Sequence, residues 1–299
     1  MNQRIKIAAL MALGILAMSS ASTMIRFAQA ERVPSLVIAA YRLTLATAVL
    51  TLPAIRDQAW KEYAKLTFST FWMLVSSGFF LGLHFATWIT SLSQTSIINS
   101  VVLVSSTPVW IGLASPVFLK ERPTRLMWAG VAISMIGAAV IGLGDLGALK
   151  SGTGFGDVLA LLGAIFAAAY LVIGRRARSK VSLTAYVWIV YGSAATFLLA
   201  LAAVTGVSIF GYTIEAYGWL IALALIPQLV GHTVANYAVR LLPATLVGIS
   251  ILGEPIGATI LGVVLLQEMP SIQQATGGGL VLIGIGLASF ANESGQENV

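Results

Sequence analysis

The sequence contains no cysteine, and only 9% of its 299 residues are charged. Without cysteine, disulfides and thiolate metal sites are excluded. A soluble domain has about a quarter charged residues, so this chain has too little charge to cover a surface exposed to water. The chain also lacks HExxH, GxSxG and Walker A strings, and no pair of acidic residues inside its apolar segments could hold a metal ion. We therefore expect no enzyme activity, no cofactor and no ATP-driven pumping by this chain alone.

Apolar residues make up most of what is present. They account for 58% of the chain, and the formal net charge is +6. This balance indicates an integral membrane protein, with the lipid bilayer as its first partner. The positive charge could also suggest nucleic acid, but the basic residues lie between apolar runs and form no polar face. We therefore exclude nucleic acid as a partner.

Long apolar runs organise the chain. Crossing a bilayer takes about 20 mostly apolar residues. Ten such segments can be drawn, at 5–27, 35–55, 68–92, 97–118, 125–145, 154–174, 182–205, 216–238, 243–266 and 272–291. They are too long for strands and lack alternation with a period of two. The predicted fold is therefore an all-α integral membrane protein with ten transmembrane helices.

The C-terminal half repeats the N-terminal half. Five residues have identical partners 147 positions later (255 − 108 = 147 for the first pair): Pro108 and Pro255, Glu121 and Glu268, Pro123 and Pro270, Gly130 and Gly277, Gly137 and Gly284. The predicted domains are a first five-helix repeat at 5–145, a second at 153–291, and a polar cytoplasmic tail at 292–299.

The distribution of Lys and Arg indicates that the two repeats are inverted. Basic residues concentrate in cytoplasmic loops, and with a cytoplasmic N-terminus 13 of the 17 Lys and Arg lie inside. Loop 175–180 then carries four basic residues, whereas its counterpart, loop 28–33, carries only Arg32. An odd number of helices per repeat makes the second copy start on the opposite side. Both termini are predicted to be cytoplasmic, and inverted repeats are typical of secondary transporters.

Two sets of motifs resemble the EamA family of the drug/metabolite transporter superfamily. The first is Thr107-Pro108-Val109-Trp110 leading to Leu119-Lys120-Glu121-Arg122-Pro123; the second is Leu241-Leu242-Pro243-Ala244-Thr245 followed by Glu254-Pro255 and Leu265-Leu266-Gln267-Glu268. The resemblance covers nearly the whole chain. It implies a ten-helix transporter of small metabolites, typically amino acids or related solutes, in a bacterial cytoplasmic membrane. Aromatic amino-acid exporters form one branch of this family.

Glu254 and Arg42 are charged residues inside apolar segments. A bare carboxylate there costs at least a few kcal/mol, so Glu254 should be paired, protonated or in contact with water. It is predicted either to bind a proton or a substrate amine, or to cap backbone groups freed by Pro255. Arg42 could snorkel outward, pair with Glu254, or hold a substrate carboxylate through two hydrogen bonds.

Pro108 and Pro255 lie at equivalent places within two apolar segments. Proline removes a backbone hydrogen bond and kinks a helix. Broken helices at matching positions in the two halves of a transporter indicate the binding site. We therefore predict two hinges near a pocket; the alternative is a pair of packing kinks.

Polar and aromatic residues in the third helix of each half are the first-choice substrate contacts. His84 and Trp88 are four apart, as are Gln228, His232 and Asn236, which places each set on one helix face. His84 and His232 are 148 residues apart, one out of register with the repeat (232 − 84 = 148). Such histidines suit proton relay or substrate hydrogen bonding, although a lone histidine is more often structural.

Two further residues complete the predicted site. Asn99 could line the pocket from the fourth helix, and Tyr170 from the sixth could stack on an aromatic substrate; the alternatives are helix packing and an interfacial aromatic belt. The predicted function is export of an amino acid or related small molecule by alternating access, with protons as a candidate coupling ion and a monomer or homodimer as the assembly. The rival hypotheses are an intramembrane scaffold without transport and, less favoured, a membrane enzyme.

Overall fold

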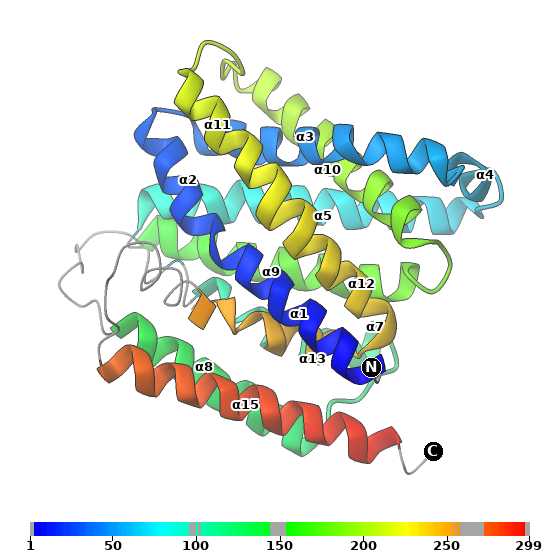
Figure 1. Cartoon of the computed structure of the whole chain (residues 1–299), viewed down its shortest axis with the longest axis vertical. Helices are drawn as coiled ribbons and strands as arrows, with labels where there is room; N and C mark the ends of the chain where they lie inside the picture. The colour runs from blue at the N-terminus through cyan, green and yellow to red at the C-terminus, as the bar shows by residue number, and fades with distance from the viewer. Residues whose placement is uncertain are drawn as a thin grey trace.

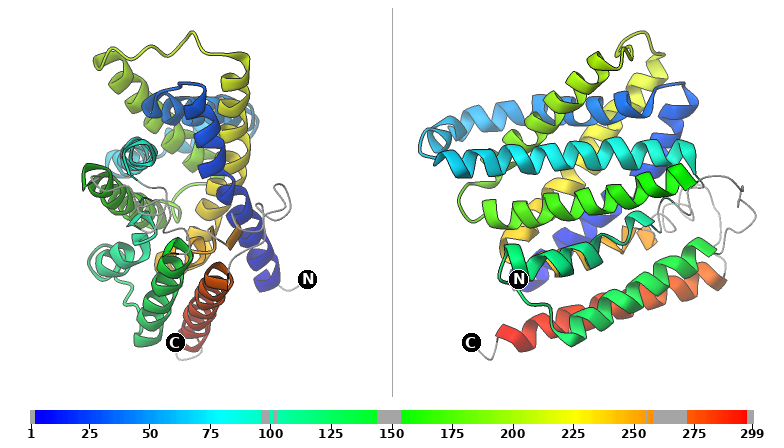
Figure 2. Two further views of the ribbon diagram at one scale, coloured as in Figure 1. Left: turned by 90° about the vertical axis from the view of Figure 1, so that its left-hand side faces the viewer. Right: turned by 180° about the vertical axis from the view of Figure 1, so that it is seen from behind.

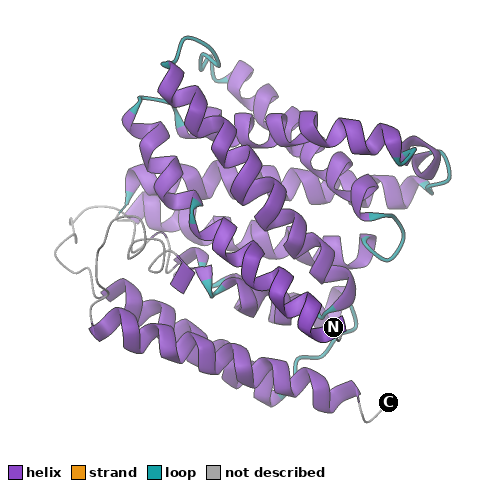
Figure 3. Ribbon diagram, in the orientation of Figure 1, coloured by secondary structure: helices purple, strands orange, loops and turns teal. Residues whose placement is uncertain are grey.

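All the regular structure in the described part of the chain is helical. The computed structural model describes residues 3–95, 100, 103–143, 154–254, 256–257 and 272–296. Every element within these ranges is a helix (Figures 1 and 3). Because a helix satisfies its backbone hydrogen bonds internally, it is the element that an apolar chain can place in lipid. The predicted all-α fold class is confirmed.

The described helices fall into the two halves of the chain. The first half holds α1 (Gln3–Ser19), α2 (Ala21–Ala30), α3 (Ser35–Arg56), α4 (Ala59–Tyr63), α5 (Phe68–Gln94), α7 (Thr107–Phe118) and α8 (Arg125–Leu143). The second half holds α9 (Gly154–Ala177), α10 (Leu183–Val204), α11 (Ile214–Leu223), the π-helix η2 (Ala224–His232), α12 (Thr233–Leu241), α13 (Ala244–Ile251) and α15 (Ile272–Gln296). α15 extends beyond residue 291, where the last apolar run ends, because the end of an apolar run marks a change of solvent rather than the end of a helix.

Six helical stretches of the described chain are long and apolar enough to span a bilayer: Ile5–Ala30, Ser35–Arg56, Phe68–Gln94, Gly154–Ala177, Leu183–Val204 and Ile214–Leu241. Shorter apolar helices cover Thr107–Phe118, Arg125–Gly137 and Ala275–Ala288. Large side chains such as Leu52, Val117 and Leu282 are exposed on the outside of the bundle. An apolar exterior of this extent needs an apolar solvent, which the lipid supplies.

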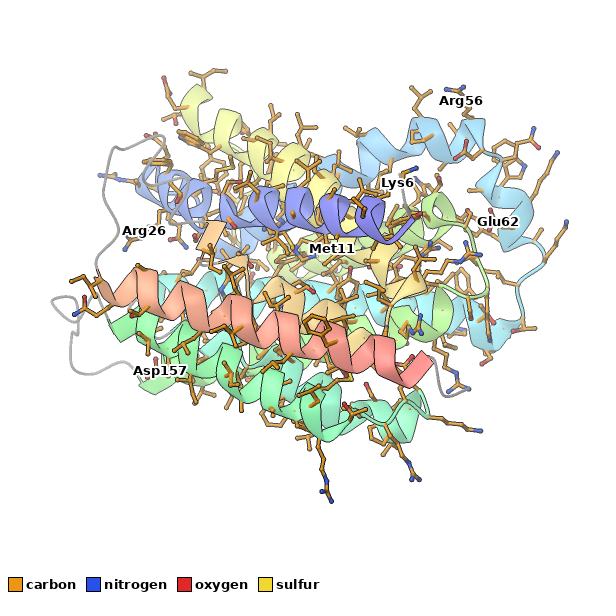
Figure 4. The ribbon with its side chains drawn as sticks, turned by 60° about the horizontal axis from the view of Figure 1, so that its bottom comes forward. Lys6, Met11, Arg26, Arg56, Glu62 and Asp157 are labelled. Atoms are coloured by element: carbon orange, nitrogen blue, oxygen red, sulfur yellow. The ribbon has the colours of Figure 1, made fainter. Side chains whose placement is uncertain are left out.

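Charged side chains mark the two ends of the bundle. Figure 4 shows Arg26 and Asp157 towards one end of the helices, and Arg56 and Glu62 towards the other. Charge is costly in the hydrocarbon and is tolerated at the interfaces. The two ends therefore correspond to the two membrane surfaces.

Hydrogen bonds and an ion pair connect the loops at the end of the bundle where Glu62 lies. The backbone N–H of Ser182 donates to Glu62 Oε2 at 2.8 Å. Arg175 Nε lies 2.7 Å from Glu121 Oε1, and its Nη1 donates to the carbonyls of Val239 and Arg240 at 2.9 Å each. The Arg175–Glu121 pair is partly exposed, so it adds at most about 1 kcal/mol of stability. Glu121 thus ties the loop before α8 to the ends of α9 and α12.

Equivalent helices of the two halves pack against each other. α3 packs on α10 and α8 on α15, and Figure 2 shows α8 and α15 side by side at one edge of the molecule. The Ser134 hydroxyl of α8 donates to the carbonyl of Val281, its counterpart 147 residues later, at 3.3 Å. α8 and α15 therefore meet each other within one chain.

Glycine contacts show that α8 and α15 run antiparallel. A Cβ added to Gly130 would lie 2.6 Å from the carbonyl oxygen of Gly284, and one added to Gly137 would lie 2.6 Å from that of Gly277. Each glycine therefore faces the counterpart of the other, as a two-fold axis between the helices requires. The two repeats are inverted relative to each other, as the charge distribution predicts.

These close contacts give a prediction about stability. Gly137→Leu is expected to force α8 and α15 apart, because the added side chain would overlap the backbone of the other helix. Overpacking of this kind costs about 1–3 kcal/mol or more, so the apparent melting temperature in detergent should fall by about 5 °C or more. Gly286→Leu in α15 is the matched control, because nothing lies within 4 Å of a Cβ added there. Equal melting temperatures for the two variants would contradict the packing described here.

The π-helix η2 explains the slip in register between the two histidines. Trp72 of α5 and Trp219 of α11 keep the offset of 147 (219 − 72), whereas His84 and His232 are 148 apart. Between them the second repeat forms η2, while the same stretch of α5 is a regular α-helix. A wider π turn accommodates one additional residue, and such turns occur frequently at functional sites.

Candidate functional site

A cavity of about 90 Å³ lies between the two repeats. Its walls come from α1, α2, α3, α5 and α7 of the first half, and from α9, η2, α12 and α13 of the second. A single water molecule needs only about 10–15 Å³ of such space. The cavity can therefore hold several waters or a small solute.

Seven of the eleven predicted site residues line this cavity: Arg42, His84, Trp88, Pro108, Tyr170, His232 and Glu254. They come from α3, α5, α7, α9, η2 and the segment after α13, so residues far apart in sequence are brought together. Gln228 and Asn236 are buried but are not among the lining residues. Asn99 and Pro255 lie outside the described residues.

Two helices are interrupted beside the cavity at equivalent points. The chain turns at Ser105–Ser106 before α7 and at Leu252–Gly253 after α13, and these positions are 147 apart (252 − 105). Each break contains a backbone hydrogen bond from an N–H to the carbonyl of the residue three positions earlier. Ser106 N–H donates to Leu103 at 3.1 Å, and Gly253 N–H donates to Ser250 at 3.0 Å. Ser105 and Leu252 both line the cavity.

The first break follows from Pro108. Proline has no N–H to offer the carbonyl of Val104, four residues earlier. The hydroxyl of Thr107 donates to that carbonyl instead, at 2.8 Å. The sequence predicts a kink at the proline itself, whereas the structure places the interruption just before it, and Pro108 becomes one of the first residues of α7.

Arg42 is fully buried, which excludes the prediction that it snorkels outward. Its Nε donates to Gln228 Oε1 at 2.8 Å, and its guanidinium lies over the ring of Phe85, 4.2 Å from the centroid. Nη1 and Nη2 have no hydrogen-bond partner among the described residues. A buried cation with two unsatisfied groups is costly unless it contacts water or a ligand.

An aromatic wall lies next to this guanidinium. The rings of His84 and Trp88 are stacked, with centroids 5.8 Å apart, and Phe85 meets His232 edge-on at 5.2 Å. His84 Nδ1 is 2.9 Å from the carbonyl of Gly163 in α9, which fixes the orientation of the ring. Trp88 Nε1 is buried without a hydrogen-bond partner in the described structure. The wall therefore combines apolar surface with one free donor.

Glu254 lines the same cavity from the segment that follows the second break. It is half-buried, and its backbone carbonyl accepts a hydrogen bond from the Ser19 hydroxyl of α1 at 2.8 Å. Because neither Nη atom of Arg42 has a partner in the described chain, Glu254 and Arg42 share the cavity without a direct ion pair. Their coupling role stays a prediction.

Asn236 belongs to a buried network behind the cavity wall. Tyr170 Oη donates to Asn236 Oδ1 at 2.5 Å, and Asn236 Nδ2 donates to Tyr191 Oη at 3.2 Å. Arg178 Nε donates to the Asn236 carbonyl at 3.2 Å. Both ends of the side-chain amide are occupied, so Asn236 holds Tyr170 in position at the cavity wall.

This network predicts a loss of stability when the amide is removed. Asn236→Leu should leave the buried Tyr170 hydroxyl without its acceptor, at a cost of about 1–3 kcal/mol, whereas the Tyr191 hydroxyl keeps its hydrogen bond with Thr233. The melting temperature in detergent should fall by several degrees, and Asn236→Asp, which keeps the acceptor for Tyr170, should lose less. A melting temperature for Asn236→Leu equal to that of the wild type would rule out the network as a stabilising element.

Several residues of the site could not be recognised from the sequence. The ring of Phe85 lies against the guanidinium of Arg42. Phe85 was not among the predicted site residues, although it directly follows His84. Ala167, Ala235 and Gly248 line the cavity with little or no side chain. Small residues carry no chemical signal of their own, and only their positions in the fold show that they leave space for a solute.

Comparison with known proteins agrees with this architecture. Residues 5–143 and 154–290 each match the EamA-like transporter family. The chain belongs to the EamA-like transporter family. An uncharacterized transporter of Archaeoglobus fulgidus is 26% identical over 204 residues, which cover 67% of this chain and 69% of the relative. The uncharacterized transporter YdfC of Bacillus subtilis is 24% identical over 211 residues, covering 69% and 67%.

A solved crystal structure has the same fold. Its TM-score is 0.77 at 18% sequence identity, over 96% of this chain and 99% of the other. At this identity the likeness concerns the fold alone. The family match and the named relatives identify this EamA-like protein as a multi-pass membrane transporter rather than an enzyme.

Proposed function

We propose that this EamA-like transporter exports a small amphipathic metabolite, with amino acids as the favoured class, by alternating access. The observation that carries the proposal is the cavity enclosed between two helix breaks at equivalent positions. In transporters built from inverted repeats, discontinuous helices at matching positions surround the substrate. Pro108 and Pro255 are the proposed hinges, and the two repeats rock about them to open the cavity to either side.

The lining of the cavity supports a solute with both charged and apolar groups. Arg42 and Glu254 carry opposite formal charges, while Trp88 and Tyr170 offer aromatic faces. Sites for drug-sized ligands have volumes of about 300–1,000 Å³, so about 90 Å³ favours a smaller molecule. Free amino acids are small molecules with this combination of groups.

The proposed location is a bacterial inner membrane with both termini in the cytoplasm. Thirteen of the 17 Lys and Arg then lie on the cytoplasmic side, as the positive-inside rule requires. The direction of export follows from the resemblance to amino-acid exporters of the family. A single chain encloses the cavity, so a monomer would suffice for transport, and a homodimer is equally compatible with the site.

Glu254 is the proposed coupling residue. A half-buried carboxylate lining a cavity in a membrane protein suits either a transported proton or the amino group of the substrate. The two roles differ in their response to a proton gradient. Transport that a protonophore leaves unchanged would remove the proton role from Glu254 and from both histidines.

Flux into proteoliposomes tests the proposed function. Purified protein is reconstituted and supplied with radiolabelled amino acids, the corresponding amines, sugars and nucleosides, with and without a pH gradient. Saturable flux of one or more amino acids, absent from protein-free liposomes, is the expected result. No flux of any member of the panel under either condition would favour a scaffold without transport.

A further inference from the structure

The side chain of Arg42 has unused hydrogen-bonding capacity at the central cavity. Its exposed fraction is 0%, yet Nη1 and Nη2 have no hydrogen-bond partner among the described residues, and the side chain lines the central cavity. Buried polar groups are almost always hydrogen-bonded, so each exception needs an explanation. A ligand that enters the cavity supplies the missing partners.

The surroundings of Arg42 fix which edge of the guanidinium faces a ligand. Gln228 accepts from Nε, so the side edge that Nε shares with one Nη is already in use. Phe85 covers one face of the plane. The end formed by Nη1 and Nη2 remains available to a ligand, and its two parallel N–H groups match the two oxygens of a carboxylate.

We infer that this cavity recognises its solute through a carboxylate, which the two Nη groups of Arg42 bind end-on. Trp88 lines the same cavity, and its Nε1, a second buried donor without a partner in the described chain, supplies a further hydrogen bond to the solute. The inference rests on the proposed function, because it names the group by which the transported solute is held. Gln228 and Phe85 act as positioning residues that hold the guanidinium.

The charge balance of the cavity favours a zwitterion. Arg42 and Glu254 are the lining residues with full formal charges, and they cancel. A carboxylate without an ammonium group, or a phosphate, would bring a net negative charge that Glu254 repels, because like charges repel strongly at low dielectric. A solute with both a carboxylate and an ammonium group leaves the cavity neutral and satisfies both residues.

Ligand pairs that differ by one group test the carboxylate site. Binding to purified transporter is measured with phenylalanine against phenethylamine, and with leucine against isoamylamine, so that each amine lacks only the carboxylate. Losing one partner of a buried charge pair should weaken binding at least about 30-fold. The same comparison with 3-phenylpropionate and 4-methylpentanoate, which lack the ammonium, should show a preference for the zwitterion that Glu254→Gln removes.

The Arg42 variants complete the experiment. In Arg42→Gln and Arg42→Lys the preference for the amino acid over its amine should shrink, to less than about threefold in the glutamine variant. The amine should bind Arg42→Lys about as it binds the wild type and Arg42→Gln at least as tightly, because the glutamine variant removes a like charge from the cavity; retained amine binding shows that each variant is folded. Arg26→Gln is the matched control, because Arg26 is exposed and does not line the cavity.

Two results would overturn the inference. One is a wild-type protein that binds no carboxylate-bearing member of the panel; the other is an amino-acid preference that survives intact in Arg42→Gln. Failure of the proposed function gives a different pattern, because carboxylate-dependent binding without flux would leave the Arg42 site standing and remove transport. Flux restricted to solutes without a carboxylate would leave transport standing and remove the Arg42 site.

Discussion

Ala167→Phe is expected to abolish transport. Ala167 lines the cavity from α9 and is almost fully buried. A phenyl ring placed there would occupy most of a space of about 90 Å³, so the solute could no longer reach Arg42 and Glu254. Initial flux in proteoliposomes should fall at least about 100-fold, and solute binding should become undetectable.

A control separates this block from a general effect of a large side chain. Ala203→Phe makes the same substitution near the end of α10, where the side chain is exposed. This variant should transport at about the wild-type rate. Substantial flux through a well-folded Ala167→Phe protein would mean that the solute takes another route.

Pro108→Ala is expected to slow transport while leaving solute affinity nearly unchanged. Alanine restores an N–H that can bond the carbonyl of Val104, and a continuous helix then competes with the break at Ser105–Ser106. In a continuous helix Pro108 would be an interior residue, at a cost of about 3 kcal/mol. Its removal should therefore favour the continuous helix over the broken one. The maximal rate should fall at least about tenfold, KM should stay within about threefold, and the melting temperature should rise.

Pro116→Ala tests whether the position of the proline matters. Pro116 also lies inside α7, but it is exposed and distant from the cavity lining. Its replacement should leave the maximal rate within about twofold of wild type. If both variants transport normally, the break before Pro108 is a packing feature and not a hinge.

The features that depend on local sequence could be predicted. Runs of apolar residues gave the helices, because bilayer thickness sets their length. The offset of 147 and the bias of Lys and Arg predicted inversion, which the crossed contacts of Gly130 and Gly137 confirm. Pro108 lines the cavity, although the interruption lies just before this proline rather than at it.

Contacts between distant residues could not be predicted. Arg42 and Gln228 are 186 residues apart, and nothing in either segment indicates their hydrogen bond. Asn236 has the same spacing from His232 as Trp88 has from His84, so periodicity suggested equal roles. The structure instead places Asn236 between Tyr170 and Tyr191, because its helix turns that side chain towards α9 and α10.

The π-helix shows a related limit of periodicity. The offset of 148 between His84 and His232 was visible in the sequence, but a one-residue slip alone fits an insertion anywhere between the matched tryptophans and the histidines. The structure places it in η2, which also carries Gln228. The residue that orients Arg42 therefore lies on a stretch where the two repeats differ in helix type.

Single-cysteine accessibility tests alternating access most directly, because the natural chain has no cysteine to interfere. Ser105→Cys places a thiol at the cavity beside the first break. Ser179→Cys and Ser208→Cys place exposed markers in loops at the two ends of the bundle. Each variant is treated with a membrane-impermeant thiol reagent from one side of sealed vesicles at a time.

Alternating access predicts that each marker reacts from one side only, and that the two markers react from opposite sides. The thiol of the Ser105→Cys variant should react from both sides, with labelling suppressed by a bound amino acid. Labelling of this variant from a single side, with or without solute, would contradict alternation of the cavity between the two faces of the membrane.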